Sequence, residues 1–326
     1  MKTIEIGTAV SNAAGLAKGF LKTGELPDGR PVQTPVLILR GNQDGPVLWI
    51  HACVHGNEYC GTFTVHELIR SLSPQALKGT LVALPALNVT AFEKNQRMSP
   101  FEGYAGGDLN RCFPGRADGS FTQQTAHAVY SELRQYAKYF IDLHTAMTPD
   151  VRWALFPNAP GETGRVADGI ARAFGFTSTL PAPMDILPGA AVMSAATDGI
   201  PAFLAEIGGK GPSFTDEAVQ DAAERLRNVM RHLGMLEGAV TKYSPILHFS
   251  NFAWVHATKG GLFQRCVRCG DTVEAGQVVG HYFDLYGDPA GEARSPKPGV
   301  VLAIHSGPIM ATGETLIHVG LNSQPA

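Results

Sequence analysis

A histidine and a glutamate three residues apart, His55 and Glu58, form the first group of side chains that could do chemistry. They follow the apolar run 47–50 and have Gly56 between them, a pattern typical of a buried strand that leads through a turn into a helix. If that helix begins near Asn57, both side chains lie on the same side of its first turn. Imidazole nitrogen and carboxylate oxygen suit Zn²⁺ at about 2.0–2.2 Å, and a catalytic zinc has three protein ligands and one position for water. The pair therefore predicts part of a zinc site and requires a third ligand.

His144 is the candidate for that third ligand, because it ends the apolar run 140–143. In a parallel sheet the carboxyl ends of the strands meet at one edge, where ligands gather. Asp142 lies on the same side of this strand, where its carboxylate could orient the His144 ring or have only a structural role. A histidine and a glutamate at this spacing are also common on solvated helix faces, so the interpretation depends on further residues.

Two further polar segments follow other predicted strands. The loop 108–115 carries Arg111, whose planar guanidinium is suited to binding a substrate carboxylate. Glu206 closes the apolar run 200–205 and is followed by two glycines that leave space for a ligand. A carboxylate at the end of a buried strand costs free energy unless it is paired or functional. Both segments therefore support a polar pocket at the same edge of the sheet.

Apolar runs alternate with helical patterns between residues 35 and 245, which favours a sheet covered by helices on both faces. The expected strands are continuous apolar runs at residues 36–39, 47–50, 81–84, 140–143 and 202–205. The expected helices have apolar residues three and four apart and lie at residues 58–72, 122–138, 162–175 and 215–236. We therefore predict an α/β fold with a mixed, largely parallel sheet.

The pattern changes after Tyr243, where short β-type runs separated by glycine and proline continue without helical periodicity. The segments Gly270–Gly276 and Gly307–Gly313 repeat a spacing of six between glycines, each followed by an apolar run. This repeat is typical of small β-barrels and sandwiches. The sequence thus predicts a catalytic domain at residues 1–243 and a small all-β barrel-sandwich domain at residues 244–326.

Four motifs occur in order along the chain: His55-Gly-Asn-Glu58, Asp108-Leu-Asn-Arg-Cys-Phe-Pro-Gly115, Asp142-Leu-His144 and Ala205-Glu-Ile-Gly-Gly209. Together they resemble the succinylglutamate desuccinylase and aspartoacylase family, which is related to the zinc carboxypeptidases. The resemblance covers nearly the whole chain, because that family also has a C-terminal β-domain. It implies that one zinc ion per chain is bound by His55, Glu58 and His144, that Asn110 and Arg111 hold a substrate carboxylate, and that Glu206 is the general base.

The chemistry implied by the resemblance is hydrolysis of the amide bond in an N-acyl amino acid or a similar acylated amine. Zinc lowers the pKa of a bound water to about 7, and a carboxylate within hydrogen-bond reach can take its proton. Glu206 is suited to this role and to protonating the departing amine. Arg97 resembles in position the family's carbonyl-polarising arginine, although a surface role for it stays open.

The same residues and the C-terminal repeat also suggest three other functions. Carboxypeptidase-like cleavage of a short peptide would use the same metal and arginine. A non-catalytic, metal-dependent binding module would keep the ligands without the reaction. The C-terminal repeat is also similar to biotinyl and lipoyl carrier domains, but segment 283–291 contains no lysine to modify. We expect this domain to shape the entrance of the pocket instead, with Tyr282, Tyr286 or Arg294 as candidates to reach the substrate.

The composition favours a small, locally recognised molecule as the partner, and Arg111 and the resemblance imply that it bears a carboxylate. The chain has 326 residues, with 26 Lys plus Arg, 29 Asp plus Glu and a formal net charge of −3. This balance does not create a field that gathers nucleic acid or anionic lipid, and no stretch reaches the roughly 20 apolar residues of a membrane-spanning helix. The start lacks a signal-peptide pattern and the five cysteines are dispersed, so we expect a cytoplasmic protein with no nucleic-acid or membrane partner; a homo-oligomer stays open.

Overall fold

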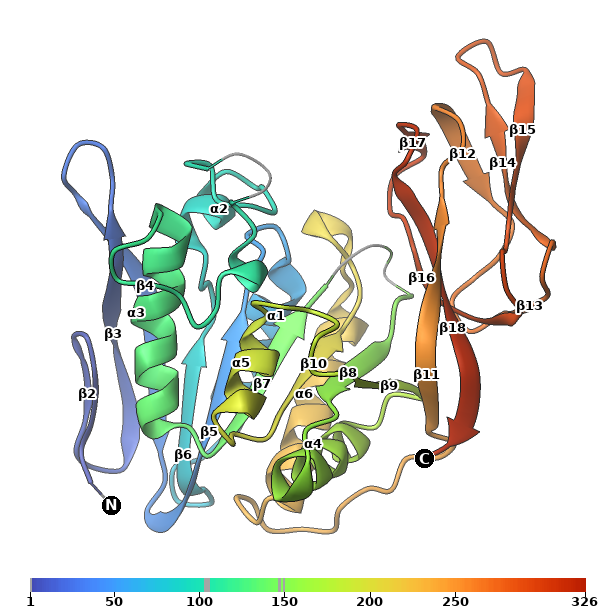
Figure 1. Cartoon of the computed structure of the whole chain (residues 1–326). Helices are drawn as coiled ribbons and strands as arrows, with labels where there is room; N and C mark the ends of the chain where they lie inside the picture. The colour runs from blue at the N-terminus through green and yellow to red at the C-terminus, as the bar shows by residue number, and fades with distance from the viewer. Residues whose placement is uncertain (1, 103–105, 146–147, 149) are drawn as a thin grey trace.

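A mixed sheet of 12 strands dominates the fold (Figure 1). The structure is a computed structural model that describes residues 2–102, 106–145, 148 and 150–326. The strands follow one another across the sheet in the order β13 (Thr272–Val273), β16 (Gly299–Ile304), β18 (Thr315–Pro325), β11 (Leu247–His256), β9 (Ser178–Ala182), β8 (Trp153–Pro157), β10 (Ala202–Glu206), β7 (Tyr139–His144), β5 (Gln43–Ala52), β6 (Lys78–Leu84), β4 (Pro31–Arg40) and β3 (Gly15–Glu25).

The centre of the sheet is parallel and its two sides are largely antiparallel. Strands β6, β5, β7 and β10 run in parallel, whereas β8 is antiparallel to β10 and β4 is antiparallel to β6. The five strands expected from continuous apolar runs lie within β4, β5, β6, β7 and β10. Strands of this kind are buried on both faces, which explains why their sequences do not alternate between apolar and polar residues. The predicted mixed α/β fold is confirmed.

Helices cover both faces of the sheet. One face packs against α1 (Tyr59–Ser71), α4 (Gly161–Phe174) and α6 (Asp216–His232), and the other against α3 (Phe121–Tyr136) and α5 (Ala191–Thr197). The four expected helices correspond to α1, α3, α4 and α6. Short helical segments were not expected, because one or two turns show little periodicity: α2 (Val89–Glu93), α5 and the 3₁₀ turns η1 (Leu109–Arg111) and η2 (Gly211–Ser213).

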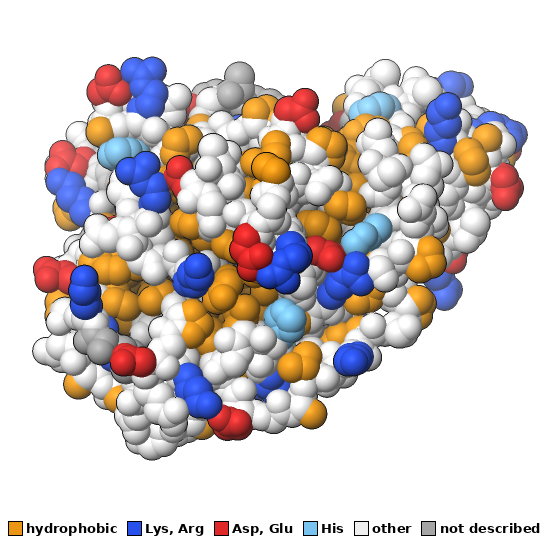
Figure 2. Space-filling view, turned by 60° about the horizontal axis from the view of Figure 1, so that its bottom comes forward, with side chains coloured by type: hydrophobic (Ala, Val, Ile, Leu, Met, Phe, Trp, Pro, Cys, Tyr) orange, Lys and Arg blue, Asp and Glu red, His pale blue; other side chains and the backbone are white. Residues whose placement is uncertain are grey.

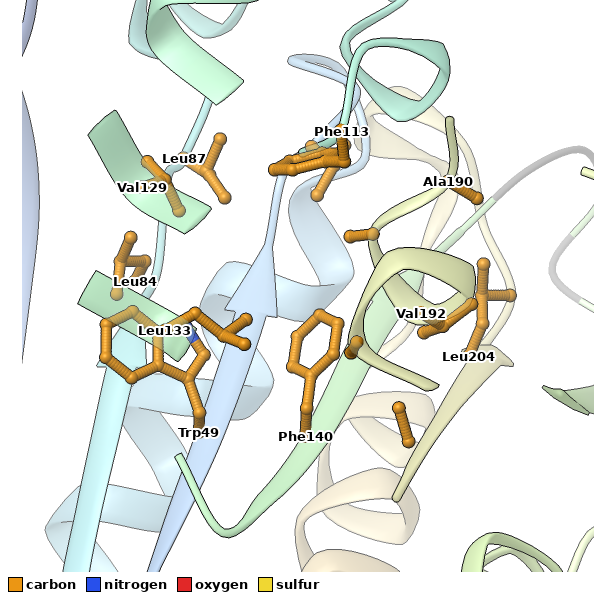
Figure 3. Close-up of a cluster of buried hydrophobic side chains, with 14 of the residues drawn as sticks. Trp49, Leu84, Leu87, Phe113, Val129, Leu133, Phe140, Ala190, Val192 and Leu204 are labelled. Carbon is orange, nitrogen blue, oxygen red and sulfur yellow. The ribbon is translucent and has the colours of Figure 1, made fainter. Parts of the chain in front are cut away.

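Successive residues of the central strands supply two separate hydrophobic cores. Trp49 of β5 and Phe140 of β7 point toward α3 and α5, together with Leu204 of β10 (Figure 3). Their neighbours Ile50 and Ile141 point to the opposite face and pack against α1, α4 and α6. Because side chains alternate across a strand, both cores hold the same strands in place and so fix the carboxyl ends of these strands.

Four of the C-terminal strands, β11, β18, β16 and β13, continue the main sheet. Strand β11 pairs in parallel with β9 at Leu247 and His248, and it pairs along its length with β18. A second sheet follows in the order β15 (Pro289–Arg294), β14 (Val278–Phe283), β12 (Gly261–Arg265) and β17 (Ile309–Met310). These strands enclose a third hydrophobic core, which includes Val255 and Tyr282. The division into two domains near residue 243 stays a prediction.

Residues 4–25 contain three strands that the sequence analysis did not anticipate. β1 (Ile4–Ile6) and β2 (Ala9–Ser11) form a hairpin that packs on β3 at one end of the main sheet. On the face of the molecule shown in Figure 2, acidic and basic side chains are interspersed, in agreement with the balanced composition. Each helix in the described part of the chain is too short or too polar to cross a lipid bilayer.

Candidate metal centre and active site

The three predicted metal ligands converge on one point at the carboxyl ends of two neighbouring strands. His55 follows the end of β5, Glu58 caps the start of α1, and His144 is the last residue of β7. Because β5 and β7 are paired in parallel, their carboxyl ends lie side by side. One ligand atom from each of the three residues lies within 4.8 Å of the others.

The two imidazoles turn the same ring nitrogen toward the carboxylate. His55 Nδ1 lies 2.9 Å from Glu58 Oε1, and His144 Nδ1 lies 3.0 Å from Glu58 Oε2. The two Nδ1 atoms are 3.2 Å apart, and all three side chains are buried. Two imidazole nitrogens and one carboxylate facing a common point are the donor set expected for zinc. These residues therefore fit the predicted metal.

A second carboxylate stands behind each imidazole. His55 Nε2 lies 3.1 Å from Asp108 Oδ1, and His144 Nε2 lies 3.2 Å from Asp142 Oδ2. The contact between His55 and Asp108 has the geometry of a hydrogen bond. The contact between His144 and Asp142 is close but does not have that geometry. Carboxylates in this position fix the tautomer and orientation of a metal-binding histidine. Asp142 was expected here, but Asp108 was not assigned a role; its place at the start of the loop motif was the signal available.

These contacts shift the pKa values of Glu58, Asp108 and His144. Burial alone would raise the pKa of Glu58, but the charges of His55 and His144 and their hydrogen bonds hold it well below its usual range. Burial would likewise raise the pKa of Asp108, which the hydrogen bond to His55 and the charge of Arg97 lower. Conversely, burial would lower the pKa of His144, which the carboxylates of Asp142 and Glu58 raise well above its usual value. Both carboxyl groups are thus held in the charged form, in which they can bind or orient.

The structure brings Arg97 into this group of charges. Its Nη1 donates a hydrogen bond of 2.9 Å to Glu58 Oε1, and its Nη2 lies 3.9 Å from Asp108 Oδ2. The backbone helps to place it, because the Arg97 carbonyl accepts a hydrogen bond from Gly56 N in the turn before α1. The side chain therefore lies at the site and not on a remote surface. Its catalytic role stays a prediction.

Asn110 and Arg111 reach the site from the 3₁₀ turn η1. The Asn110 side chain bridges two elements: its Oδ1 accepts from Ala191 N at 3.0 Å, and its Nδ2 lies 3.4 Å from His144 Nε2. Arg111 lines the cavity, and its Nη1 donates to the Asn110 carbonyl. Gly189, with a φ of +78°, packs so closely on this turn that a Cβ there would lie 2.1 Å from the Arg111 carbonyl oxygen. The approach of the 189–190 backbone to η1 therefore requires glycine.

Glu206 lies next to the metal-binding group in the sheet. It ends β10, where it is the register partner of His144 on one side and of Trp153 of β8 on the other. Neighbouring strands are about 4.8 Å apart, so the backbone of Glu206 lies one strand away from a predicted metal ligand. Its side chain is partly buried and lines the same cavity as Arg97 and Arg111.

A cavity of about 910 Å³ joins these residues to the C-terminal strands. One wall includes His55, His144, Arg97 and Glu206 with residues of the loop 108–111. The other wall includes residues of β11 and β18 and of the loops between β16 and β17 and between β17 and β18. Tyr282, Tyr286 and Arg294, which the sequence suggested as candidates to reach the substrate, do not line this cavity. Tyr282 is buried in the third core, Tyr286 is 93% exposed at a hairpin turn, and Arg294 is bonded to Glu292 and to the Gly276 carbonyl. The cavity is lined instead by residues that include Phe252, Trp254 and His318.

Comparison with known proteins places this fold and site in one family. The model of the succinylglutamate desuccinylase/aspartoacylase catalytic domain matches residues 44–233, which is more than half of the chain. The chain belongs to the succinylglutamate desuccinylase/aspartoacylase family. The matched range contains all of the predicted site residues, from His55 to Glu206. The resemblance inferred from the four motifs is therefore confirmed.

Individual relatives of the family match almost the full length of the chain. The N-alpha-acetyl-L-2,4-diaminobutyric acid deacetylase of Halomonas elongata is 28% identical over 320 residues, covering 93% of this chain and 91% of the relative. The product-bound ectoine utilization protein EutE (DoeB) of Ruegeria pomeroyi is 26% identical with a TM-score of 0.85, covering 95% of this chain and 97% of the other. A succinylglutamate desuccinylase/aspartoacylase of Rhodobacter sphaeroides, 23% identical with a TM-score of 0.83 and 97% coverage of both chains, shares the fold.

Proposed function

We propose that this chain is a zinc-dependent deacylase that hydrolyses the amide bond of an N-acyl amino acid or a similar small acylated amine. Membership of the family and the deacetylase of Halomonas elongata support amide hydrolysis. The observation that carries the proposal is the convergence of His55, Glu58 and His144 within 4.8 Å, beside a cavity that Glu206 and Arg111 also line.

We expect His55, Glu58 and His144 to hold the zinc ion, with Asp108 and Asp142 orienting the two imidazoles. When bound, zinc would supply a Lewis acid for the scissile carbonyl and for the attacking water. The burial of all three ligands supports this assignment, because a buried cluster of charges is stable only when its members are paired or bind an ion.

The remaining residues of this wall have roles that follow from their chemistry and position. Glu206 would accept the proton of the attacking water and return it to the departing amine nitrogen. Arg97 would stabilise negative charge that develops on the carbonyl oxygen, since its guanidinium already lies against Glu58. Asn110 and Arg111 would hold the substrate carboxylate, and Asn110 would also hold the turn that presents Arg111.

The direct test is elemental analysis of the purified protein together with a screen of acetylated and succinylated amino acids. We expect about one zinc per chain and turnover of at least one N-acyl amino acid. Dipeptides belong in the same screen, because the same site would serve a carboxypeptidase-like reaction. Turnover of dipeptides alone would replace the deacylase proposal, and metal binding without any turnover would favour a binding module.

The carboxylate-binding role of Arg111 has a separate test. We expect Arg111→Lys to raise the KM of a carboxylate-bearing substrate by about 10-fold, because lysine keeps the charge but loses the two-pronged hydrogen bond. The KM of the matching substrate with a carboxamide in place of the carboxylate should change little. An equal loss for both substrates would contradict the assignment.

A further inference from the structure

Three aromatic rings on the C-terminal side of the cavity form a surface that the proposed mechanism does not use. Phe252 and Trp254 lie on the same side of β11, and His318 of β18 is the register partner of Trp254. The rings of Trp254 and His318 meet edge to face with centroids 3.9 Å apart, and Phe252 stacks on His318 at 5.9 Å. We call Phe252, Trp254 and His318 the aromatic wall.

The aromatic wall borders the cavity, although Phe252 also packs against the first hydrophobic core. All three residues line the cavity, and Trp254 is 43% exposed although it is one of the largest apolar side chains of the chain. The other two tryptophans, Trp49 and Trp153, are 0% and 8% exposed. An exposed tryptophan whose ring is held in place by a neighbouring ring is a preformed contact surface for a ligand.

The aromatic wall carries no net charge near neutral pH. Burial and the charge of the nearby His256 lower the pKa of His318 to about 4, so its ring is neutral. Charged residues that line the cavity lie outside the wall: Arg97, Arg111 and Lys210 follow α2, lie in η1 and precede η2, and Glu314 lies in the turn before β18, where its Oε2 accepts a hydrogen bond from Ala311 N. The wall therefore suits a group that is itself uncharged.

The order of strands places this wall on the amine side of the proposed reaction. Moving across the sheet away from His144, the next strand carries Glu206 and the one after it carries Trp153 and Leu155, which also line the cavity. Beyond these strands and β9 lies β11 with the aromatic wall. A group that protonates the departing amine must lie beside the amine nitrogen, so the amino-acid half of the substrate would extend from Glu206 toward the C-terminal side of the cavity, where the aromatic wall lies.

We propose that the aromatic wall binds the side chain of the amino-acid half, so that preferred substrates are N-acyl derivatives of amino acids with aromatic or other bulky, uncharged side chains. This proposal rests on the proposed function. The volume of about 910 Å³ agrees with it, because ligand pockets range from about 300 to 1,000 Å³ and a small acylated amino acid would leave much of this cavity unfilled.

The test compares zinc-loaded wild-type protein with Trp254→Ala on three substrates: the N-acetyl derivatives of L-phenylalanine and L-alanine, and N-alpha-acetyl-L-2,4-diaminobutyrate. For the wild type we expect the KM of the phenylalanine derivative to be about 10- to 100-fold below that of the alanine derivative, as burial of an aromatic side chain predicts. Trp254→Ala should raise the KM of the phenylalanine derivative by about 3- to 10-fold and leave its kcat and the alanine derivative unaffected. Trp254→Phe should keep most of the preference, and Tyr286→Ala, which removes an exposed aromatic ring outside the cavity, should change nothing.

Calorimetric binding of the products L-phenylalanine and L-alanine separates this proposal from the proposed function. Tighter binding of phenylalanine that is lost in Trp254→Ala would support the wall even if no N-acyl amino acid is turned over, a result that would defeat the proposed function alone. Equal binding and equal KM values for the two amino acids would overturn the aromatic wall as a specificity site. A larger loss in Trp254→Ala for the diaminobutyrate derivative would also overturn it, because the wall would then bind a cation through its ring faces.

Discussion

The two walls of the cavity are built from different kinds of contact. At the ends of β5 and β7, charged side chains are buried and each has several polar partners, as Glu58 does with His55, His144, Arg97 and the Thr145 amide. On β11 and β18, rings pack against one another and one of them stays partly exposed. Removing one member of a buried charge network leaves the other charges unpaired and destabilises the whole network. Changing one ring in a packed cluster has a smaller, local effect on stability.

Under the two proposals, the buried charges would perform the chemistry and the aromatic wall would select the substrate. A substitution at the buried charges should change metal content or the rate of the chemical step. A substitution at the aromatic wall should change the affinity for particular substrates, or stability, while the chemical step is retained. The two walls can therefore be separated by measuring metal content, kcat and KM for each variant.

His144→Ala should have the largest effect. It removes one of the three proposed ligands and leaves the carboxylates of Glu58 and Asp142 buried without a partner on that side. We expect the zinc content of the purified variant to fall far below one ion per chain and turnover to be lost, as measured by elemental analysis and the substrate screen. His127→Ala is the matched control, because His127 is exposed on α3. Full zinc content in His144→Ala would reject the ligand set.

Glu206→Gln should separate metal binding from the reaction. The amide keeps the size of the side chain but cannot accept the proton of water, so we expect kcat to fall on the order of 10² to 10⁴ while zinc content stays unchanged. Elemental analysis and steady-state kinetics on the same preparation measure both quantities. If kcat is retained, Glu206 is not the base. If zinc is lost as well, Glu206 belongs to the metal site.

Asp108→Asn should weaken metal binding without removing a ligand. The Asp108 carboxylate accepts from His55 Nε2, and an amide in its place orients the imidazole less well. Changes of this kind cost about 10- to 100-fold in metal affinity. Competition with a zinc chelator measures that affinity, and Asp118→Asn, which changes an exposed carboxylate, is the control. Unchanged affinity would show that Asp108 only shapes the loop through its hydrogen bond to Asn110 N.

The charged side of the cavity, with His55, His144 and Glu206, could be predicted from the sequence because these residues lie in short motifs at the ends of apolar runs. His55 and Glu58 share one turn, and the apolar runs that precede His144 and Glu206 already indicate buried strands. The motifs did not indicate which side chain each of these residues would contact. Asp108 lies 53 residues from His55, and only the packing of η1 against α3 and α5 brings its carboxylate to the imidazole.

The aromatic wall could not be predicted in the same way. Phe252 and Trp254 were recognisable as part of a β-type region. His318 lies more than 60 residues further along the chain and becomes their neighbour only because β11 pairs with β18. Tyr282 was a reasonable candidate for a substrate contact because its side chain is aromatic. Side chains alternate between the two faces of β14, however, and that of Tyr282 points into the third core. A shift of one residue in a strand exchanges its two faces, so the cavity-facing residues depend on a register that the sequence pattern leaves open.

His318→Phe should have the smallest effect and should act on stability and not on chemistry. The pKa of His318 is about 4 in the folded protein and about 6.5 in an unfolded chain. Between these values the unfolded state binds the proton more tightly, so protonation destabilises the wild type as the pH falls below 6.5. Phenylalanine keeps the ring contact with Trp254 and cannot be protonated. Urea unfolding at each pH gives the difference in the free energy of unfolding between His318→Phe and the wild type. We expect this difference to be about 1 kcal/mol more favourable to the variant at pH 5.5 than at pH 7. An identical difference at both pH values, or the same gain from His281→Phe at an exposed position, would contradict a buried, neutral His318 in the aromatic wall.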